Sequence, residues 1–289
     1  AGQIAVRPLG GVNFKTQLRE PTGHLGRLPL PAVVHGDEHV AGKRELLSGG
    51  LKKAPLSAAN AAALRKHFPW TAPVSLRDRK TTIGCGDRLG LASVGHIAAI
   101  KHYQATPVLA QQSMRELDMT GRTYRQVVDD TVFMVYQAGY KDGYGADGDH
   151  LKKIKDIDVA LAAGMPMITL DLSEVMLAAA GDWSQSQIDE AFAKLPADTR
   201  KQLLDSYADK KIKVGESEIA MDAGTVRRCA VMYLQALDFA KEVYEHLKSK
   251  RGDQFDLEIS IDETTSPTLP SHHYFIAGEL KRRGVEFTS

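Results

Sequence analysis

The sequence is poor in cysteine and has no long apolar run. Its 289 residues include two cysteines, Cys85 and Cys229, which lie far apart in the chain. A disulfide framework is therefore not expected, and a reducing compartment is favoured. Because no run of about 18 apolar residues occurs, no membrane span is predicted. The opening residues AGQIAVRPLGG also lack the pattern of a signal peptide, so the sequence predicts a soluble, cytoplasmic protein.

Net charge is nearly absent as well, at +1 for 37 basic and 36 acidic residues. Nothing in the whole-chain charge therefore marks the protein for nucleic acid or for an anionic membrane. The segment GCGDRLG, at residues 84–90, has the wrong glycine spacing for a dinucleotide-binding loop, and its Asp-Arg pair stands where small residues should approach a pyrophosphate. We therefore reject a Rossmann fold and expect a small-molecule partner, with a homo-oligomer left open.

What the chain does contain is an alternation of strand and helix patterns. Its hydrophobic content of 43% is enough for a sizeable core. Strand patterns begin near residues 82, 108, 145, 167, 256 and 285, with helical patterns between most of them. This alternation predicts parallel strands joined by right-handed crossovers. Because a closed barrel of this type needs eight strands, the expected fold class is α/β, a (β/α)8 TIM-like barrel that is incomplete at the C-terminus.

Two regions depart from the alternation. Residues 1–55 are rich in Gly, Pro and His and are predicted to form an N-terminal extension or cap of short strands, ahead of a barrel domain at 56–289. Residues 174–223 are typical of polar helices with a short turn at KVGES, and we interpret them as an insertion over the barrel mouth or at a subunit contact. A later helix is expected to begin at a Ser271 cap and to end near Arg283, ahead of one more strand at VEFTS.

The strand pattern FDLEISIDE ends in carboxylates ahead of a Thr/Ser/Pro loop. Carboxylates at the carboxyl end of a strand stand where α/β enzymes place their chemistry. Glu263 is expected at the barrel mouth. Glu258 shares a face with Asp262 but is expected ~6.6 Å deeper, the rise of two strand residues. His272, in the next helix, either points into the site or has a structural role.

The segment GADGDHLK is the other strong local signal. Asp147, Asp149 and His150 lie within four positions, framed by glycines. An imidazole and carboxylates are suitable donors for a divalent metal, and a carboxylate beside a metal-bound histidine is suited to act as a base. A solvated turn is the structural alternative.

Two further strand ends carry polar side chains. Asp87 can accept sugar hydroxyls or help to hold a metal, and Arg88 can bind a carboxylate through two parallel hydrogen bonds; an internal salt bridge at a tight turn is the alternative. Gln111 and Gln112 end the pattern PVLAQQS, and amides there are suited to polyol recognition, with a surface loop as the alternative.

Taken together, these segments resemble the tagaturonate/fructuronate epimerase family, which is related to the tagatose 4-epimerases. The resemblance rests on FPWTAPVSL, KTTIGCGDRLGLAS, PVLAQQS, GADGDHLK and the SIDETTSPT segment with the helix after it. It covers the chain from about residue 55 to the end, and the series of motifs is more specific than any one of them.

The resemblance implies a metal-dependent epimerase on a (β/α)-barrel. It implies that Asp149 is the proton acceptor, that His150 is a metal ligand with His272 as a candidate second one, and that Glu263, or Glu258 in its place, is the proton donor. The metal would be Mn, Ni, Co or Zn. Family members continue beyond a segment like VEFTS, and further metal-binding histidines are expected there.

The implied reaction inverts a carbon that is not adjacent to the ketone, so simple α-proton exchange does not achieve it. Retro-aldol cleavage and reclosure, a remote carbanion or a transient oxidation remain open. Arg88 or Lys80 is expected to hold the substrate carboxylate, with Asp87 and Gln112 near the hydroxyls. The competing functions are an epimerase of neutral ketoses such as fructose and tagatose, a class II type aldolase, and an inactive sugar-binding homologue.

Overall fold

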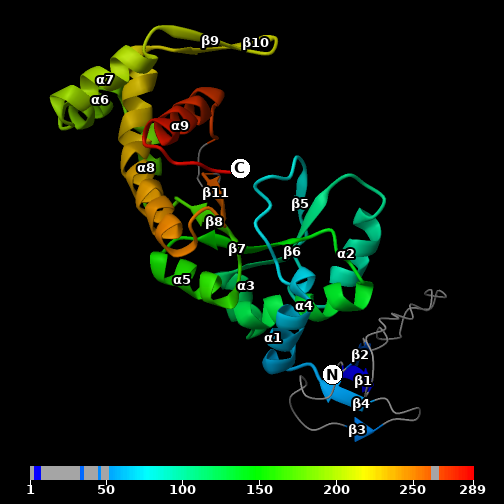
Figure 1. The fold of residues 1–289 in the computed structure, drawn as a ribbon. Helices are drawn as coiled ribbons and strands as arrows, with labels where there is room; N and C mark the ends of the chain where they lie inside the picture. Colours follow the sequence, from blue (N-terminus) through cyan, green and yellow to red (C-terminus); the bar gives the residue numbers. More distant parts are fainter. Residues whose placement is uncertain (1–2, 8–32, 36–44, 47–51, 262–266) are drawn as a thin grey trace. The chain divides into compact units, whose positions relative to one another are not determined.

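The computed structural model of the chain describes residues 3–7, 33–35, 45–46, 52–261 and 267–289 (Figure 1). The chain divides into two compact units. One comprises residues 1–168 with 254–256, and the other comprises residues 169–253 with 257–289. Glu263 lies outside the described residues. Among the described helices, none combines the length and the apolar character that a membrane crossing needs.

The first unit opens with short strands. The first of them pairs in parallel with the second and antiparallel with the fourth, and the sheet order is β2-β1-β4-β3. These strands and the helix after them are β1 (Gln3–Arg7), β2 (Val33–His35), β3 (Glu45–Leu46), β4 (Lys52–Pro55) and α1 (Ala58–His67).

A five-stranded sheet has the order β11-β8-β7-β6-β5, and its strands β5, β6 and β7 belong to the first unit. The pairs β5–β6 and β6–β7 are parallel, so the predicted alternation of strands and crossover helices is confirmed as a mixed α/β fold. The strands are β5 (Thr82–Gly84), β6 (Thr106–Ser113), β7 (Gly145–Leu151), β8 (Met167–Asp171) and β11 (Asp256–Ser260). The helices between the first four are α2 (Ser93–Ile100), α3 (Met114–Thr120), α4 (Tyr124–Ala138) and α5 (Ile154–Ala163).

Helix ends in this unit follow local sequence signals. Ser113 and Thr123 each form a capping box with the residue three positions later, which satisfies backbone N–H groups at the starts of α3 and α4. Gly139 and Gly164 end α4 and α5 in the left-handed conformation, which glycine adopts at little cost. Both ends of α4 are therefore set by residues at the helix boundary itself, Thr123 and Gly139.

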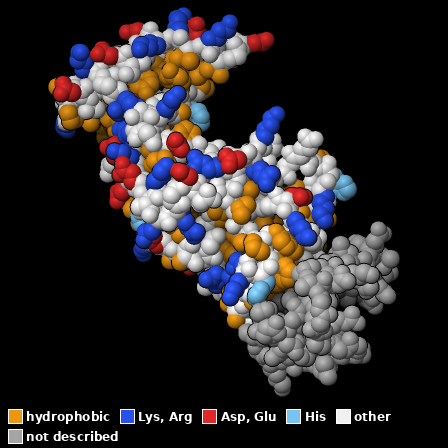
Figure 2. Space-filling view, viewed as in Figure 1, with side chains coloured by type: hydrophobic (Ala, Val, Ile, Leu, Met, Phe, Trp, Pro, Cys, Tyr) orange, Lys and Arg blue, Asp and Glu red, His pale blue; other side chains and the backbone are white. Residues whose placement is uncertain are grey.

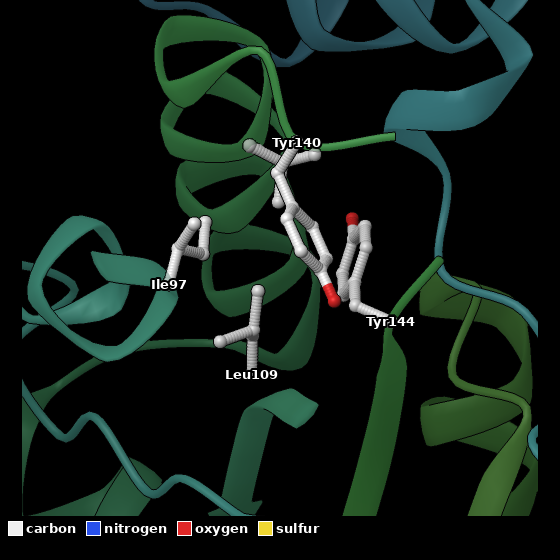
Figure 3. Close-up of a cluster of buried hydrophobic side chains, with 5 residues drawn as sticks. Ile97, Leu109, Tyr140 and Tyr144 are labelled. Carbon is white, nitrogen blue, oxygen red and sulfur yellow. The ribbon is translucent and has the colours of Figure 1, made fainter. Parts of the chain in front are cut away.

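The core of the first unit lies between its sheet and its helices. Ile97 from α2, Leu109 from β6 and Val135 from α4 meet Tyr140 and Tyr144, and all five are buried (Figure 3). Removing large apolar side chains from water is the main favourable term in folding. This packing fixes β6 and β7 against the helices, so that the residues at the carboxyl ends of these strands have defined directions.

The second unit is mainly helical, and α8 is its longest element, with 29 residues. Residues 174–223, which the sequence predicts to form polar helices, contain the helices α6 and α7. They also contain an antiparallel hairpin where the sequence predicts only a turn. The elements are η3 (Ala178–Asp182), α6 (Gln185–Ala193), α7 (Ala197–Tyr207), β9 (Lys210–Val214), β10 (Ser217–Met221), α8 (Ala223–Arg251) and α9 (Pro270–Arg282).

Helix α9 begins one residue before the expected Ser271 cap. Its N-cap residue is Leu269, which provides no side-chain hydrogen bond, and Pro270 takes the first helical position. Proline is well suited to this position because its missing N–H would have no partner there. The prediction of a Ser271 cap is therefore wrong, whereas the end of the helix near Arg283 is confirmed.

The last residues run beside β11. The Thr288 N–H donates to the Leu257 carbonyl oxygen at 2.8 Å, and the Ile259 N–H donates to the Ser289 carbonyl oxygen at 3.0 Å. This pairing agrees with the strand predicted at VEFTS, although no regular strand is assigned there. On the face of the described residues drawn in Figure 2, basic and acidic side chains are interspersed, which agrees with the balanced charge of the sequence.

Candidate active site

The carboxyl ends of β6 and β7 lie in a defined register. Gln111 is opposite Asp147, and Ser113 is opposite Asp149. Because side chains alternate along a strand and paired residues point to the same face, Gln111, Asp147 and Asp149 are expected on one face of this pair. The register thus gathers an amide and two carboxylates from the PVLAQQS and GADGDHLK segments.

The innermost member of this group is Asp147, whose side chain is fully buried. Its carboxylate accepts a hydrogen bond from Gln111 Nε2 at 3.1 Å. A buried carboxylate requires such donors, because burial removes the water that would otherwise solvate its charge. Asp147 is therefore part of the polar frame beneath the strand ends rather than an accessible base.

Gln112 lies on the opposite face from Gln111. Its partner in the register is Gly148, where an added Cβ would meet Ala160 of α5 at 2.9 Å, so this face is covered by helices. Gln112 is 1% exposed, and neither polar atom of its amide has a hydrogen-bond partner among the described residues. Its role in substrate binding stays a prediction, whereas Gln111 lies on the face of Asp147.

Asp149 and His150 occupy the last positions of the same strand end. Asp149 Oδ1 lies 4.0 Å from His150 Nε2, and the two side chains are 24% and 32% exposed, respectively. His150 has φ of +51°, a left-handed conformation that few residues other than glycine adopt. The backbone therefore departs from regular strand geometry where it presents the imidazole. A half-exposed carboxylate and an imidazole at a strand end can transfer protons or bind a cation.

Asp87 holds the loop between β5 and α2 in place. Its two carboxylate oxygens accept hydrogen bonds from the Leu91 N–H at 3.1 Å and the Ala92 N–H at 2.6 Å. Asp87 therefore has a structural role in this conformation, and its predicted contact with substrate stays a prediction.

Arg88 forms a close ion pair with Glu116, the residue that completes the capping box of α3. Arg122 supports the same loop by donating to the Arg88 carbonyl oxygen at 2.8 Å and to Asp130 at 2.6 Å. The internal salt bridge considered from the sequence is thus present. The Arg88 side chain is nevertheless 68% exposed, so part of its guanidinium group is accessible to a ligand carboxylate.

Lys80 is exposed and precedes β5. The start of β5 pairs with Thr106, at the beginning of β6, whereas Asp149 pairs with Ser113 at the end of this eight-residue strand. At about 3.3 Å per residue, the two ends of β6 are roughly 23 Å apart. The structure therefore does not bring Lys80 to the edge of the sheet that holds Asp149.

In the second unit, Glu258 is half-buried on β11. It accepts hydrogen bonds from Thr169 Oγ1 at 3.4 Å and from Ser289 Oγ at 2.6 Å. These neutral donors hold the carboxylate in place without neutralising its charge. Because Glu263 lies outside the described residues, the assignment of the proton donor to Glu263 or to Glu258 stays a prediction.

His272 on α9 is 7% exposed, and its ring packs against Tyr233 of α8. Its Nδ1 lies 3.1 Å from the Tyr233 hydroxyl. Burial and then the positive charge of Arg228 lower the pKa of His272, so the neutral imidazole is favoured. This is the environment of a satisfied core histidine, and the metal-ligand role stays a prediction.

The described residues do not assemble a complete metal site. Among them, no group of three or more His, Cys, Asp and Glu side chains is placed to hold a metal ion. The donor types of Asp149 and His150 are suited to a divalent cation, but two donors are fewer than a protein site ordinarily supplies.

A sequence model of UxaE, tagaturonate epimerase, matches residues 33–289. The chain belongs to the tagaturonate epimerase family. The family resemblance drawn from the sequence motifs is thereby confirmed. It extends further toward the N-terminus than the motifs indicated, because the match begins at residue 33 rather than near residue 55.

Relatives of this family agree in sequence and in structure. The tagaturonate/fructuronate epimerase of Thermotoga maritima is 39% identical over 231 residues, which are 80% of this chain and 47% of the relative. The native structure of the fructuronate-tagaturonate epimerase UxaE from Cohnella laeviribosi has a TM-score of 0.81 and 41% identity, over 86% of this chain and 50% of that chain. The structure with one glycerol matches equally well. The chain thus spans about half the length of these relatives.

Tyr124, at the start of α4, is a residue near the strand ends that no motif in the sequence points to. It is 1% exposed, and its hydroxyl has no hydrogen-bond partner among the described residues. Burial raises the pKa of this phenol, and the charges of Asp147 and Asp149 raise it further. The capping box TYRQ signals a helix start, but it does not reveal that the phenol is buried where the charges of Asp147 and Asp149 act on it.

Proposed function

We propose that this chain provides the acid–base centre of an epimerase that interconverts D-tagaturonate and D-fructuronate. The observation that carries the proposal is the half-exposed Asp149 carboxylate, 4.0 Å from His150 at the carboxyl end of β7, in a chain that matches the epimerase family over residues 33–289. We also infer that the five-stranded sheet is part of a closed (β/α)8 barrel. The parallel order of β5, β6 and β7 and the pairing of residues 288–289 with β11 support this inference.

The two hexuronates differ at the hydroxyl-bearing carbon that is β to the ketone. Inversion by a retro-aldol route begins when Asp149 accepts the proton of that hydroxyl. The carbon–carbon bond toward the ketone then breaks, which leaves an aldehyde and an enolate. Rotation of the aldehyde and attack of the enolate on its other face re-form the bond with inverted configuration, and Asp149 returns the proton. Glu263 or Glu258 is the acid that protonates the developing enolate oxygen, and its carboxylate takes this proton back as the bond re-forms and the ketone is regenerated.

Metal dependence is a separate part of the proposal. His150, with His272 as the second candidate ligand, would hold a divalent cation of the Mn, Ni, Co or Zn type, and such an ion would polarise the ketone. Arg88 is proposed to bind the substrate carboxylate through the part of its guanidinium group that Glu116 leaves accessible. We propose a small ketose acid as the substrate, a cytoplasmic location and a homo-oligomeric assembly.

The decisive experiment incubates the purified protein with D-fructuronate and follows the product by proton NMR. We expect D-tagaturonate to accumulate until equilibrium, and the reverse reaction to reach the same ratio. Release of free three-carbon cleavage products would instead indicate an aldolase. Conversion of fructose to tagatose without conversion of fructuronate would indicate a neutral-ketose epimerase. The absence of any conversion, with metal supplied, would overturn the proposal.

A further inference from the structure

Three neighbouring strands place Gly84, Gln111 and Asp147 in contact near their carboxyl ends. Gln111 Nε2 donates to Asp147 Oδ2 at 3.1 Å, and a Cβ added to Gly84 would lie 2.7 Å from Gln111 Oε1. The amide of Gln111 is therefore held between a carboxylate on β7 and a glycine on β5. Neither neighbour was singled out by the sequence as a determinant of substrate binding.

The carboxylate determines which way the amide faces. An ionised carboxylate only accepts hydrogen bonds, whereas the Gln amide has a donor side and an acceptor side. The NH2 group must therefore face Asp147, and Oε1 must face away from it. Because Asp147 is fully buried, reversing the amide would place two oxygens together in a dry environment, which is strongly unfavourable.

The glycine determines where the amide oxygen lies. A Cβ at 2.7 Å from Oε1 is far closer than a nonbonded carbon normally approaches an oxygen, so any other residue at position 84 would displace the end of the Gln111 side chain. Gln111 is half-buried rather than enclosed, and its Oε1 accepts no hydrogen bond among the described residues. The result is a fixed acceptor, accessible from outside, on the same face as Asp149.

We propose that Gln111 Oε1 accepts a hydrogen bond from a substrate hydroxyl, and that Asp147 and Gly84 are the positioning residues that orient it. The ligand class is a polyhydroxylated chain. A fixed acceptor requires a hydroxyl donor at one place and rejects a ligand that presents a carbonyl or carboxylate oxygen there, because two acceptors would then face each other. This inference rests on the proposed function for the identity of the ligand.

The experiment uses Gly84→Ala, with Gly86→Ala as the matched control. Both glycines lie within three positions of each other in the β5 region, but an added Cβ at Gly86 meets nothing within 4 Å. The Gly84 contact is with the far end of a flexible side chain, so this variant is expected to fold, which thermal unfolding would verify. Loss of one hydrogen bond to the substrate is expected to raise KM for D-tagaturonate and its Kd in calorimetry by about tenfold, with kcat little changed. Gly86→Ala is expected to leave both constants unchanged.

A double-mutant cycle separates orientation of Gln111 from a general effect of the alanine. In a Gln111→Ala background the added Cβ has no amide to displace, so Gly84→Ala should have no further effect on KM or Kd. Asp147→Asn keeps the shape of the side chain but permits the Gln111 amide to reverse, so it is expected to weaken substrate binding several-fold. This variant tests the orientation of Gln111 independently if Gln111→Ala does not fold. An equal effect of Gly84→Ala with and without Gln111 would overturn the inference.

The outcomes also distinguish this inference from the proposed function. If the wild-type protein converts fructuronate and Gly84→Ala behaves like Gly86→Ala, the role of Gln111 is wrong and the function stands. If the wild-type protein binds tagaturonate without converting it, and Gly84→Ala weakens that binding, the role of Gln111 stands and the function is wrong. If the wild-type protein neither binds nor converts the hexuronates, both are wrong.

Discussion

The Tyr233 hydroxyl lies 3.1 Å from His272 Nδ1 in the packing between α8 and α9. This pairing gives a histidine that the sequence offered as a metal ligand a structural partner in the core of the second unit. Burial in the same packing lowers the pKa of His272, so protonation of this histidine makes the stability of the protein depend on pH.

The first prediction concerns this pH dependence. A lowered pKa means that the unfolded chain binds more protons than the folded chain, so the stabilisation is complete above the unfolded pKa of about 6.5 and is lost as pH falls through the folded value. Urea unfolding at a series of pH values should show the free energy of unfolding falling with acidification, and His272→Gln should reduce that dependence. The control is His102→Gln, an exposed histidine. Identical pH dependence in wild type and His272→Gln would contradict the prediction.

The second prediction concerns the buried carboxylate of Glu279 on α9. Burial raises the pKa of this group, but the hydrogen bonds and charges of Arg282 and Arg283 outweigh burial and lower it overall. The Tyr207 hydroxyl also donates to it at 3.0 Å. Glu279→Gln leaves the Arg282 guanidinium without its anion and Arg283 with only Asp238, so we expect about 3 kcal/mol of destabilisation in denaturant unfolding. Glu190→Gln, which breaks an exposed pair with Lys194, should cause no measurable change, and equal stability of the two variants would refute this role.

The third prediction tests the base. Asp149→Asn removes the proton acceptor while keeping the size of the side chain, and it should lower kcat by ~10²-fold or more. Asp118→Asn is the control, because Asp118 is exposed on α3. Epimerisation followed by NMR gives both rates. Near-normal turnover of Asp149→Asn at wild-type metal content would remove Asp149 from the mechanism.

The fourth prediction distinguishes Arg88 from Lys80. Arg88→Gln should raise KM for the hexuronates by about 10- to 100-fold, the loss of a charge-assisted hydrogen bond. It should have little effect on a neutral ketose such as tagatose, which has no carboxylate. Lys80→Gln should change neither the KM for the hexuronates nor the KM for tagatose, because Lys80 precedes β5 rather than following it. The outcome against the assignment is an equal change in KM for both kinds of substrate.

The fifth prediction concerns the metal ion. Metal analysis of the purified protein should find about one divalent cation per chain, and His150→Ala should lower that content together with activity. Added chelator should abolish conversion, and returning Mn, Ni, Co or Zn should restore it. His102→Ala serves as the control, since this exposed side chain follows α2. Full activity after complete removal of metal would exclude metal dependence.

Much of the fold was predictable because its signals are local. The capping residue Thr123 and the terminating Gly139 lie next to the helix that they limit, and their effects depend on backbone conformation within a few residues. The strand in GADGDHLK and the alternation of strands and helices follow from short-range periodicity in the same way. The hairpin between Lys210 and Met221 was missed because its strands are short and rich in charge, and the contact of β10 with α9 is not local.

By itself, the sequence determined which chemical groups stand at the strand ends and the family to which their motifs belong. Only the tertiary structure decided what each group contacts. Strand register placed Gln111, rather than Gln112, beside Asp147, and packing of α9 against α8 enclosed His272 with Tyr233. The physical reason is that alternation fixes which residues of one strand share a face, whereas the direction of that face and the partners across it depend on contacts between residues far apart in the chain.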